Sequence, residues 1–188
     1  MNLVHRLRPI QVIAGAYLVL TFVSAMLLYM PFSLKPGQSL RFIDALFTSA
    51  SAISVTGLTV TNTSETFSLA GQIILLVVIQ LGGIGIMTLG TMVWVVLGKK
   101  IGLRNRLIIQ LDQNQTSLAG LVRLIRNIFV LVLVIEAVGA TILGVYFMRF
   151  YPWHEALYLG LFHAVTGFTH SGFDLFGNSL LSFRHDVV

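Results

Sequence analysis

The fold of this chain depends on two short polar strips, Ser54-Val55-Thr56-Gly57 and Thr169-His170-Ser171-Gly172. Each strip directly follows a short apolar segment, Phe42–Ile53 in the first case and Ala156–Phe168 in the second. Neither segment is long enough to cross a bilayer, and such a length is typical of a re-entrant, interfacial or core helix. The sequence on either side of these segments decides between those alternatives.

Long apolar runs flank the short segments. Ile10–Met30 and Leu69–Leu97 contain no charged residue, and Ile128–Phe150 contains only Glu136 and, near its end, Arg149. Each run can cross about 30 Å of hydrocarbon at about 1.5 Å per residue. Leu69–Leu97 has residues to spare, so we expect it to be tilted or locally bent. Ile10–Met30 has some features of a signal peptide, but it is long and lacks a clear cleavage site, so we expect a retained helix.

The composition excludes several protein classes. Of 188 residues, 56% are hydrophobic and 10% are charged, and the mean hydropathy is +0.88. A soluble domain carries about 25% charged residues, and a disordered chain has low hydrophobicity. The chain has no cysteine, so a disulfide framework and a cysteine-based zinc or redox site are excluded.

The basic residues indicate the orientation in a membrane. The net charge is +5, but the basic residues lie between apolar runs, so we interpret them as loop charges of a membrane protein and expect no nucleic-acid partner. Eight of the twelve Lys and Arg lie in the N-terminus and in Gly98–Asn127. Cytoplasmic loops carry such an excess, so we predict a multi-pass protein with both regions in the cytoplasm and both short segments on the outer side. Gly98–Asn127 is also a candidate contact for anionic lipid or a cytosolic partner.

The order of segments repeats along the chain. Phe42-x-Asp44-Ala45-Leu46 matches Trp153-x-Glu155-Ala156-Leu157 at an offset of 111 residues, and Gly57 matches Gly172 at an offset of 115. The second copy therefore has four extra residues, which is about one helical turn. Because a full turn leaves each face of a helix pointing in the same direction, both copies can place their glycine alike. We predict an all-α membrane protein with a first span–pore–span unit at 1–97, a basic cytoplasmic loop at 98–122, and a second unit at 123–188 that lacks its second spanning helix.

The polar strips have the chemistry of an ion filter. Irregular backbone at membrane depth is tolerated only where protein or a water-filled path surrounds it. Glycine permits a backbone that turns successive carbonyls toward one axis, and rings of carbonyls replace the hydration shell of an alkali cation. The C-terminus of the preceding short helix carries about −0.5 charge, which favours a cation. We therefore predict that the two strips present backbone carbonyls to an alkali cation.

Several motifs together carry a family resemblance. Ser49–Leu58 (SASAISVTGL) resembles the first pore loop of the Trk/Ktr/HKT superfamily of potassium transporters, and Gln80–Gly85 resembles its first inner helix. Leu97–Arg104 resembles the cytoplasmic turn of the Ktr branch, and Leu161–Val165 resembles the second pore helix. The similarity extends over essentially the whole chain and identifies it as the N-terminal part of a bacterial Ktr-type membrane subunit.

The resemblance implies a fold, a function and partners. Such a subunit has four span–pore–span units around one pore, and this chain supplies one unit and most of a second. The implied function is potassium uptake across the bacterial cell membrane, with Na+ as a candidate coupling or activating ion and no covalently bound cofactor. The resemblance implies a selectivity filter in which K+ binds mainly to the backbone carbonyls of Val55, Thr56, Gly57, His170, Ser171 and Gly172. The implied partners are membrane lipid, a second copy in a homodimer and cytosolic nucleotide-binding regulatory subunits. The second strip departs from the amide-rich pattern of the family at Thr169-His170-Ser171, so only its carbonyls are expected at the ion.

Some of these residues allow other interpretations. Glu136 inside a span is either a functional acid or a hydrogen-bond partner of a neighbouring helix. The glycines of Gly82–Gly85 lie in an apolar run without a preceding strand, so close helix packing is favoured over nucleotide binding. His163, His170 and Asp174 could suggest a metal hydrolase, but the chain has no paired-histidine motif. An intramembrane enzyme or a non-transporting scaffold remain as alternatives, although an enzyme would need a nucleophile–base pair and a scaffold would not need two filter-like strips.

Overall fold

The structure is a computed structural model that describes residues 9–85, 88, 102–112 and 120–184. This part of the chain is helical and contains no β-strand apart from an isolated bridge between Leu34 and Phe67. The predicted all-α class is therefore confirmed. The elements are α1 (Pro9–Tyr29), η2 (Pro31–Ser33), α2 (Phe42–Ile53), α3 (Thr63–Thr66), α4 (Leu69–Ile84), α6 (Leu103–Asp112), α7 (Leu121–Phe147), α8 (Trp153–Phe168) and η3 (Leu181–Phe183).

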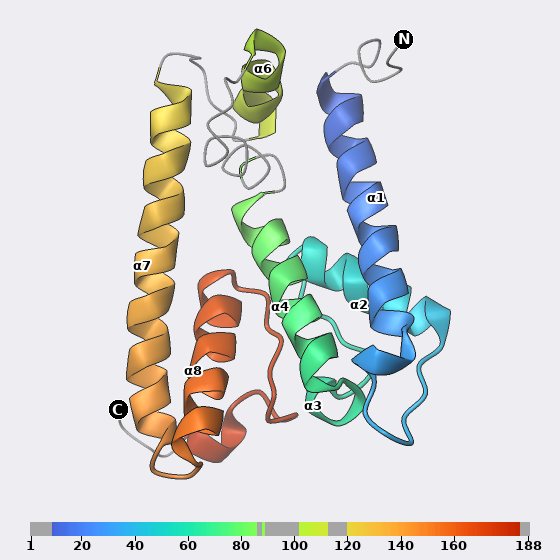
Figure 1. Cartoon of the computed structure of the whole chain (residues 1–188), viewed down its shortest axis with the longest axis vertical. Coiled ribbons are helices and arrows are strands. Elements are labelled where there is room, and N and C mark those ends of the chain that lie inside the picture. The colour runs from blue at the N-terminus through green and yellow to red at the C-terminus, as the bar shows by residue number, and fades with distance from the viewer. Residues whose placement is uncertain (1–8, 86–87, 89–101, 113–119, 185–188) are drawn as a thin grey trace.

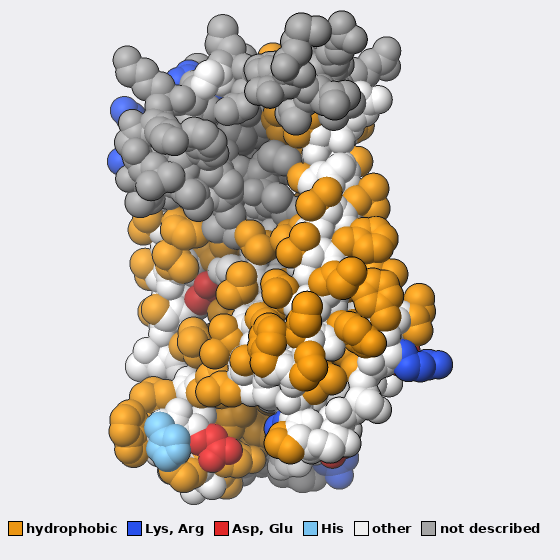
Figure 2. Space-filling model, turned by 45° about the vertical axis from the view of Figure 1, so that its right-hand side comes forward, with side chains coloured by type: hydrophobic (Ala, Val, Ile, Leu, Met, Phe, Trp, Pro, Cys, Tyr) orange, Lys and Arg blue, Asp and Glu red, His pale blue; other side chains and the backbone are white. Residues whose placement is uncertain are grey.

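The long helices share one direction. The N-terminal ends of α1 and α7 lie at the end of the molecule that also holds α6, and α4 runs the opposite way between the short helices α2 and α8 (Figure 1). Among the described helices, Ile10–Tyr29 in α1 and Val122–Phe147 in α7 are long and apolar enough to cross a membrane. Figure 2 shows hydrophobic side chains spread over the described face with few charged side chains among them.

The core lies where α4 meets the short helices. Leu28 of α1, Leu75 and Ile79 of α4, and Phe162 of α8 are fully buried, and Phe173 joins them from the segment after the second strip. Core positions of this kind fix how α4 sits against both short helices, since closely packed interiors leave few voids.

The two short helices begin at matching positions. α2 covers the predicted Phe42–Ile53 and has 12 residues, while α8 has 16 residues and begins at Trp153, three residues before the predicted start at Ala156. Phe42 and Trp153 are the first residues of the matched motifs, so the four extra residues of the second copy lie within α8. Pro152 is the N-cap residue of α8, and the helix begins directly after it, with Glu155 in its first turn.

An ion pair marks the start of α2. Arg41 Nε and Nη2 donate to the carboxylate oxygens of Asp44 at 2.8 and 2.9 Å. The hydrogen bonds from Arg41 lower the pKa of the Asp44 carboxyl, so it stays charged in the first turn of α2. A negative charge at a helix N-terminus complements the helix dipole.

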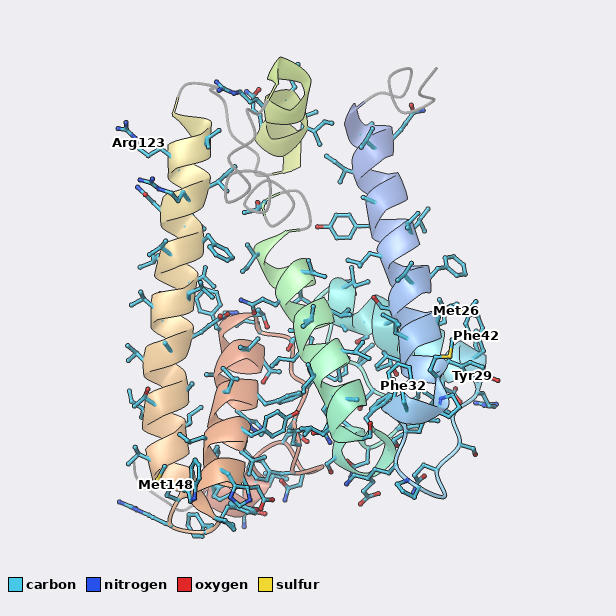
Figure 3. All side chains as sticks on the ribbon, in the orientation of Figure 1. Met26, Tyr29, Phe32, Phe42, Arg123 and Met148 are labelled. Atoms are coloured by element: carbon cyan, nitrogen blue, oxygen red, sulfur yellow. The ribbon has the colours of Figure 1, made fainter. Side chains whose placement is uncertain are left out.

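The spanning helix of the second unit begins earlier than predicted. α7 runs from Leu121 to Phe147 rather than over Ile128–Phe150. Gly120 is left-handed, with φ of 70°, and separates α7 from the preceding chain. Arg123 and Arg126 belong to the basic segment Gly98–Asn127, but they lie in the first two turns of α7, since arginine is a good helix former. Figure 3 shows Arg123 pointing away from the bundle at one end of α7 and Met148 at the other.

The predicted loop needs correction, whereas the second apolar run has a local break of the kind expected. Gly98–Asn127 contains the helix α6 as well as the start of α7, and its residues 98–101 and 113–119 lie outside the described part. Residues 86–87 and 89–97 of Leu69–Leu97 also lie outside the described part, and the break falls just before them. There α4 ends at Ile84, and Gly85 adopts φ of 93° and ψ of 131°. Those angles belong to no α-helix, and glycine adopts them most easily. The 16 residues of α4 cover about 24 Å at about 1.5 Å per residue.

Small residues allow α7 and α8 to pack closely. A Cβ on Gly160 of α8 would lie 2.5 Å from the backbone nitrogen of Gly144 and 2.6 Å from the carbonyl oxygen of Ala140, both on α7. Lipid tails are as apolar as side chains, so membrane helices associate through such close contacts rather than through hydrophobic burial alone. The absence of a side chain at Gly160 therefore sets the distance between α7 and α8.

Gly160→Ala should destabilise the protein by about 1–3 kcal/mol, because the added methyl overpacks the α7–α8 contact. Gly167→Ala on the same helix is the matched control, since a Cβ there meets no atom within 4 Å. We expect the control to be neutral or to stabilise by up to about 1 kcal/mol through helix propensity. Thermal unfolding of the purified proteins in detergent measures both effects. Equal midpoints for the two variants would show that α7 and α8 do not pack as described.

Candidate ion-binding filter

The first strip begins with a tight cap on α2. The Val55 N–H donates to the carbonyl of Ala52 at 3.3 Å, and the Thr56 N–H donates to the carbonyl of Ser51 at 2.9 Å. These two bonds form a Schellman motif, which satisfies carbonyls at the end of a helix. The cap therefore ends α2 and turns the chain back toward the side from which it entered.

The second strip has the same hydrogen bonds 115 residues later. The His170 N–H donates to the carbonyl of Gly167 at 3.2 Å, and the Ser171 N–H donates to the carbonyl of Thr166 at 3.0 Å. The side chains before the caps also agree. Ser54 Oγ donates to the carbonyl four residues earlier at 2.7 Å, and Thr169 Oγ1 does the same at 2.8 Å. The two strips are therefore structurally equivalent, although few of their residues are identical.

The backbone of each strip alternates between positive and negative φ. In the first strip φ is 54° at Val55 and 78° at Gly57, and in the second it is 57° at His170 and 71° at Gly172. The residue between each pair does not have a positive φ. An ordinary strand keeps φ negative and points successive carbonyls to opposite sides, whereas a backbone with alternating signs of φ can turn them toward one side.

Val55 is the unusual member of this pattern. Glycine normally occupies the left-handed position of a Schellman motif, and a β-branched residue there is an outlier. Backbone strain of this kind costs about 1–3 kcal/mol and concentrates at functional sites. The strip thus keeps a conformation that its own sequence disfavours, which requires support from the residues around it.

The two strips touch each other directly. A Cβ on Gly57 would clash with the carbonyl oxygen of Ser171 and lie 3.3 Å from Cα of Gly172. A Cβ on Gly172 would meet Cα of Gly57 at 3.6 Å, which is ordinary van der Waals contact. The structure therefore brings the two predicted strips together, and the glycine of the first strip tolerates a side chain less than the glycine of the second.

The glycines of α4 hold the ends of both short helices. A Cβ on Gly82 would lie 2.8 Å from the carbonyl carbon of Ile53, the last residue of α2, and a Cβ on Gly83 would lie 2.9 Å from Cβ of Thr169, the residue after α8. This is the close packing expected of these glycines. The sequence did not indicate that their partners would be the two residues adjoining the strips.

A polar hollow lies beside the strips. It has a volume of about 340 Å³, and its lining includes Gly57, Gly172, Thr61, Asn62 and Asp174. Such a volume accommodates several water molecules. The Asp174 carboxylate accepts hydrogen bonds from the N–H groups of two later residues of its own loop, Gly177 and Ser179. The hollow thus joins the glycines of both strips to polar side chains and to the carboxylate of Asp174.

His163 fixes the segment that follows the second strip. Its Nδ1 donates to the carbonyl of Leu159 at 2.8 Å, and its Nε2 accepts from the N–H of Leu175 at 3.3 Å. The ring is buried and stacks on Phe176, with 4.6 Å between ring centroids. One nitrogen donates and the other accepts, so the imidazole is neutral. Sequence reasoning considered His163 only as a metal ligand and missed this role, because Leu175 is distant along the chain.

The metal-hydrolase alternative finds no support in the geometry. Within residues 9–85, 88, 102–112 and 120–184, no three His, Cys, Asp or Glu side chains come together in a way that could hold a metal ion. His163 is committed to backbone groups, and Asp174 caps its own loop.

The acid in the span of the second unit bonds to a neighbouring helix. Glu136 of α7 is 5% exposed, and both carboxylate oxygens accept from Nε2 of Gln80 on α4, at 2.8 and 2.9 Å. The acid therefore bonds to a neighbouring helix rather than to the strips.

Comparison with known proteins assigns the family. The TrkH family, described as cation transport protein, matches residues 8–188. The chain belongs to the TrkH family. The resemblance to the Trk/Ktr superfamily is thereby confirmed, and the family consists of membrane cation transporters rather than enzymes.

Individual relatives of this TrkH-family chain are potassium uptake proteins. It is 48% identical over 186 residues to the Ktr system potassium uptake protein D of Bacillus subtilis, and 39% identical over 181 residues to the Ktr system potassium uptake protein B of the same organism. It is 37% identical over 182 residues to the potassium/sodium uptake protein NtpJ of Enterococcus hirae. These matches cover 96–98% of the chain, which spans about two fifths (40–41%) of the length of these relatives.

His163→Leu should destabilise this TrkH-family chain by about 1–3 kcal/mol, because the buried N–H of Leu175 loses its acceptor. His154→Leu is the matched control, since His154 lies on the same helix and is exposed. We expect the control to change the free energy of unfolding by less than about 0.5 kcal/mol. Thermal unfolding of both purified variants measures the difference. A midpoint for His163→Leu equal to that of the control would contradict the anchoring role.

Proposed function

We propose that this chain forms part of the pore of a potassium uptake transporter, with the backbone carbonyls of its two strips as part of the selectivity filter. One observation carries the proposal: two strips with the same alternating φ pattern lie in direct backbone contact. A turn or a helix connection would need neither the repeated pattern nor the contact. Carbonyls on one side of a backbone supply the ligands that replace the hydration shell of K+.

The relatives support K+ as the ion. Two are named Ktr system potassium uptake proteins, and a third is named a potassium/sodium uptake protein. We therefore propose K+ as the transported ion and Na+ as the candidate coupling or activating ion. The chain spans about two fifths of these relatives, so in this proposal the remaining carbonyls around the ion come from further units of the transporter.

The electrostatics suit an ion that must bind and then leave. Neither strip contains Asp, Glu, Lys or Arg, so carbonyl dipoles and the C-terminal ends of α2 and α8 supply the attraction. A formal charge would bind the ion more tightly and slow its release, whereas conduction requires binding weak enough for exit. Asp174 in the neighbouring hollow adds a negative charge outside the strips, where it raises the local concentration of cations.

Localisation and partners complete the proposal. We propose that the protein is a multi-pass protein of the bacterial cell membrane with a cytoplasmic N-terminus. The basic residues that indicate this orientation of the N-terminus, Arg6 and Arg8, lie outside the described residues. Homodimer formation and association with cytosolic nucleotide-binding regulatory subunits are proposed from the Trk/Ktr resemblance. An intramembrane enzyme is not favoured, since the family transports cations, and a non-transporting scaffold would leave the matched strips without a role.

Substitution of the two glycines tests the filter. Gly57→Ala adds a methyl group that clashes with the carbonyl oxygen of Ser171, and it also adds the strain of a positive φ in a residue with a Cβ. If the difference between K+ and Na+ binding changes by about 1.4 kcal/mol or more, the preference for K+ over Na+ should fall by about tenfold or more. Gly172→Ala carries only the φ strain and should have a smaller effect. The measurement is competition between K+ and Na+ uptake by a full-length subunit with this sequence, in cells that lack other potassium uptake.

Gly37→Ala is the matched control for this experiment. Gly37 has φ of 81°, and a Cβ there meets no atom within 4 Å, so it shares the strain but lies outside the strips. We expect unchanged selectivity for the control and similar membrane protein levels for all three variants. Unaltered selectivity in Gly57→Ala would identify the strips as ordinary turns and refute the filter.

Thiol labelling tests the orientation. Gly102 is exposed and has open space around it, and Glu65 is exposed on α3, so a cysteine fits at either position. The chain has no native cysteine to give a background. An impermeant thiol reagent added to intact cells should label Glu65→Cys and should label Gly102→Cys only after the membrane is opened. The reverse pattern would invert the proposed topology.

A further inference from the structure

A buried hydrogen bond joins α4 to α7 inside the membrane region. Nε2 of Gln80 donates to Oε1 and Oε2 of Glu136 at 2.8 and 2.9 Å, and Glu136 is 5% exposed. The other amide atom, Oε1 of Gln80, is buried and has no hydrogen-bond partner among the described residues. The link therefore consists of one amide nitrogen and one carboxylate group.

The bond lies one turn from the contacts that hold both short helices. Gln80 precedes Gly83 by three residues on α4, and Gly83 meets Thr169 at the end of α8. Glu136 precedes Gly139 by three residues on α7, and a Cβ on Gly139 would lie 3.4 Å from Ala164 of α8. Three residues correspond to about 4.5 Å along a helix. The hydrogen bond thus acts at the level where the short helices end.

A shift of α4 would affect both strips at once. Gly82 and Gly83 approach Ile53 and Thr169 so closely that there is no room for a side chain. These contacts are with the last residue of α2 and the first residue of the second strip. Close-packed interfaces transmit small displacements rather than absorbing them. A displacement of α4 would therefore be passed on to Ile53 and Thr169, and so to both strips.

We propose that Gln80 and Glu136 are positioning residues that fix α4 against α7 and thereby hold the two strips at the spacing that favours K+ over Na+. This inference rests on the proposed function, and neither residue contacts the ion. The two residues act through a hydrogen bond rather than through charge. A glutamine at position 136 offers an acceptor oxygen at the same reach, so it preserves the link.

The test compares K+ and Na+ binding in a purified full-length subunit that carries this sequence. An ion that binds the folded state raises the thermal midpoint, so the half-effective concentrations of K+ and Na+ report their relative affinity. Gln80→Ala and Glu136→Ala should each lower the K+ preference by about tenfold. The double variant should lower it no further, because the two residues act as one unit.

Two variants separate positioning from other roles. Glu136→Gln should keep the K+ preference within about twofold of the wild type, because it retains the acceptor. Thr141→Ala is the matched control on α7, since its hydroxyl donates only to the carbonyl of Ala137 on its own helix, at 2.7 Å, and it should also stay within about twofold. If Glu136→Ala does not accumulate, Gln80→Asn replaces it in the test. Asparagine keeps the amide group, but its side chain is one methylene shorter and cannot reach Glu136, so this variant must show the same loss of K+ preference.

Each remaining outcome overturns the inference in a recognisable way. An unchanged K+ preference in both alanine variants would show that the pair does not position the strips. Additive losses would show that the residues act separately, and a loss in Glu136→Gln equal to that in Glu136→Ala would assign the role to the charge. Absence of any K+-dependent stabilisation in the wild type would refute the proposed function itself, whereas normal wild-type binding with unaffected variants would refute only the positioning role.

Discussion

The contact between the backbone of Gly57 and the carbonyl of Ser171 constrains the rest of the structure. Two strips from distant parts of the chain can approach so closely only if the first has no side chain at that point. The approach also requires both short helices to end at the same level, which the equivalent caps on α2 and α8 achieve. The carbonyls that the strips present are therefore placed by backbone geometry, and the side chains serve mainly to hold that geometry.

The surrounding helices supply the support that the strained strips need. α4 lies against the ends of both short helices through Gly82 and Gly83, and α7 holds α8 through a seam of small residues around Gly160. His163 secures the segment after the second strip. A left-handed Val55 would relax in a freely exposed loop, so its conformation depends on this packing. Glycines that permit close contacts between helices thus support the strips as much as the residues that make hydrogen bonds do.

The sequence predicted the parts of this arrangement that leave a local signal. α2 has the predicted bounds, and α8 ends at the predicted Phe168, directly before the second strip. Hydropathy could not reveal that α4 ends at Ile84, because glycine is compatible with either a helix or the angles of Gly85. The positions of the charged residues placed the start of the second unit's spanning helix too late, at Ile128 instead of Leu121, because arginine occurs both in loops and at helix termini. The partners of His163 and of Gly82 could not be predicted, because they lie in other segments of the chain and meet these residues only in the folded structure.

The central claim is that carbonyls of both strips coordinate K+ together. Its most direct test is a crystal structure of a full-length subunit with this sequence, grown with thallium in place of potassium, because the anomalous signal of that ion identifies its position. The account predicts an anomalous peak between the two strips, within coordination distance of the carbonyls of Thr56 and Ser171. A transport-competent protein whose ion lies elsewhere, with no peak at either strip, would contradict it.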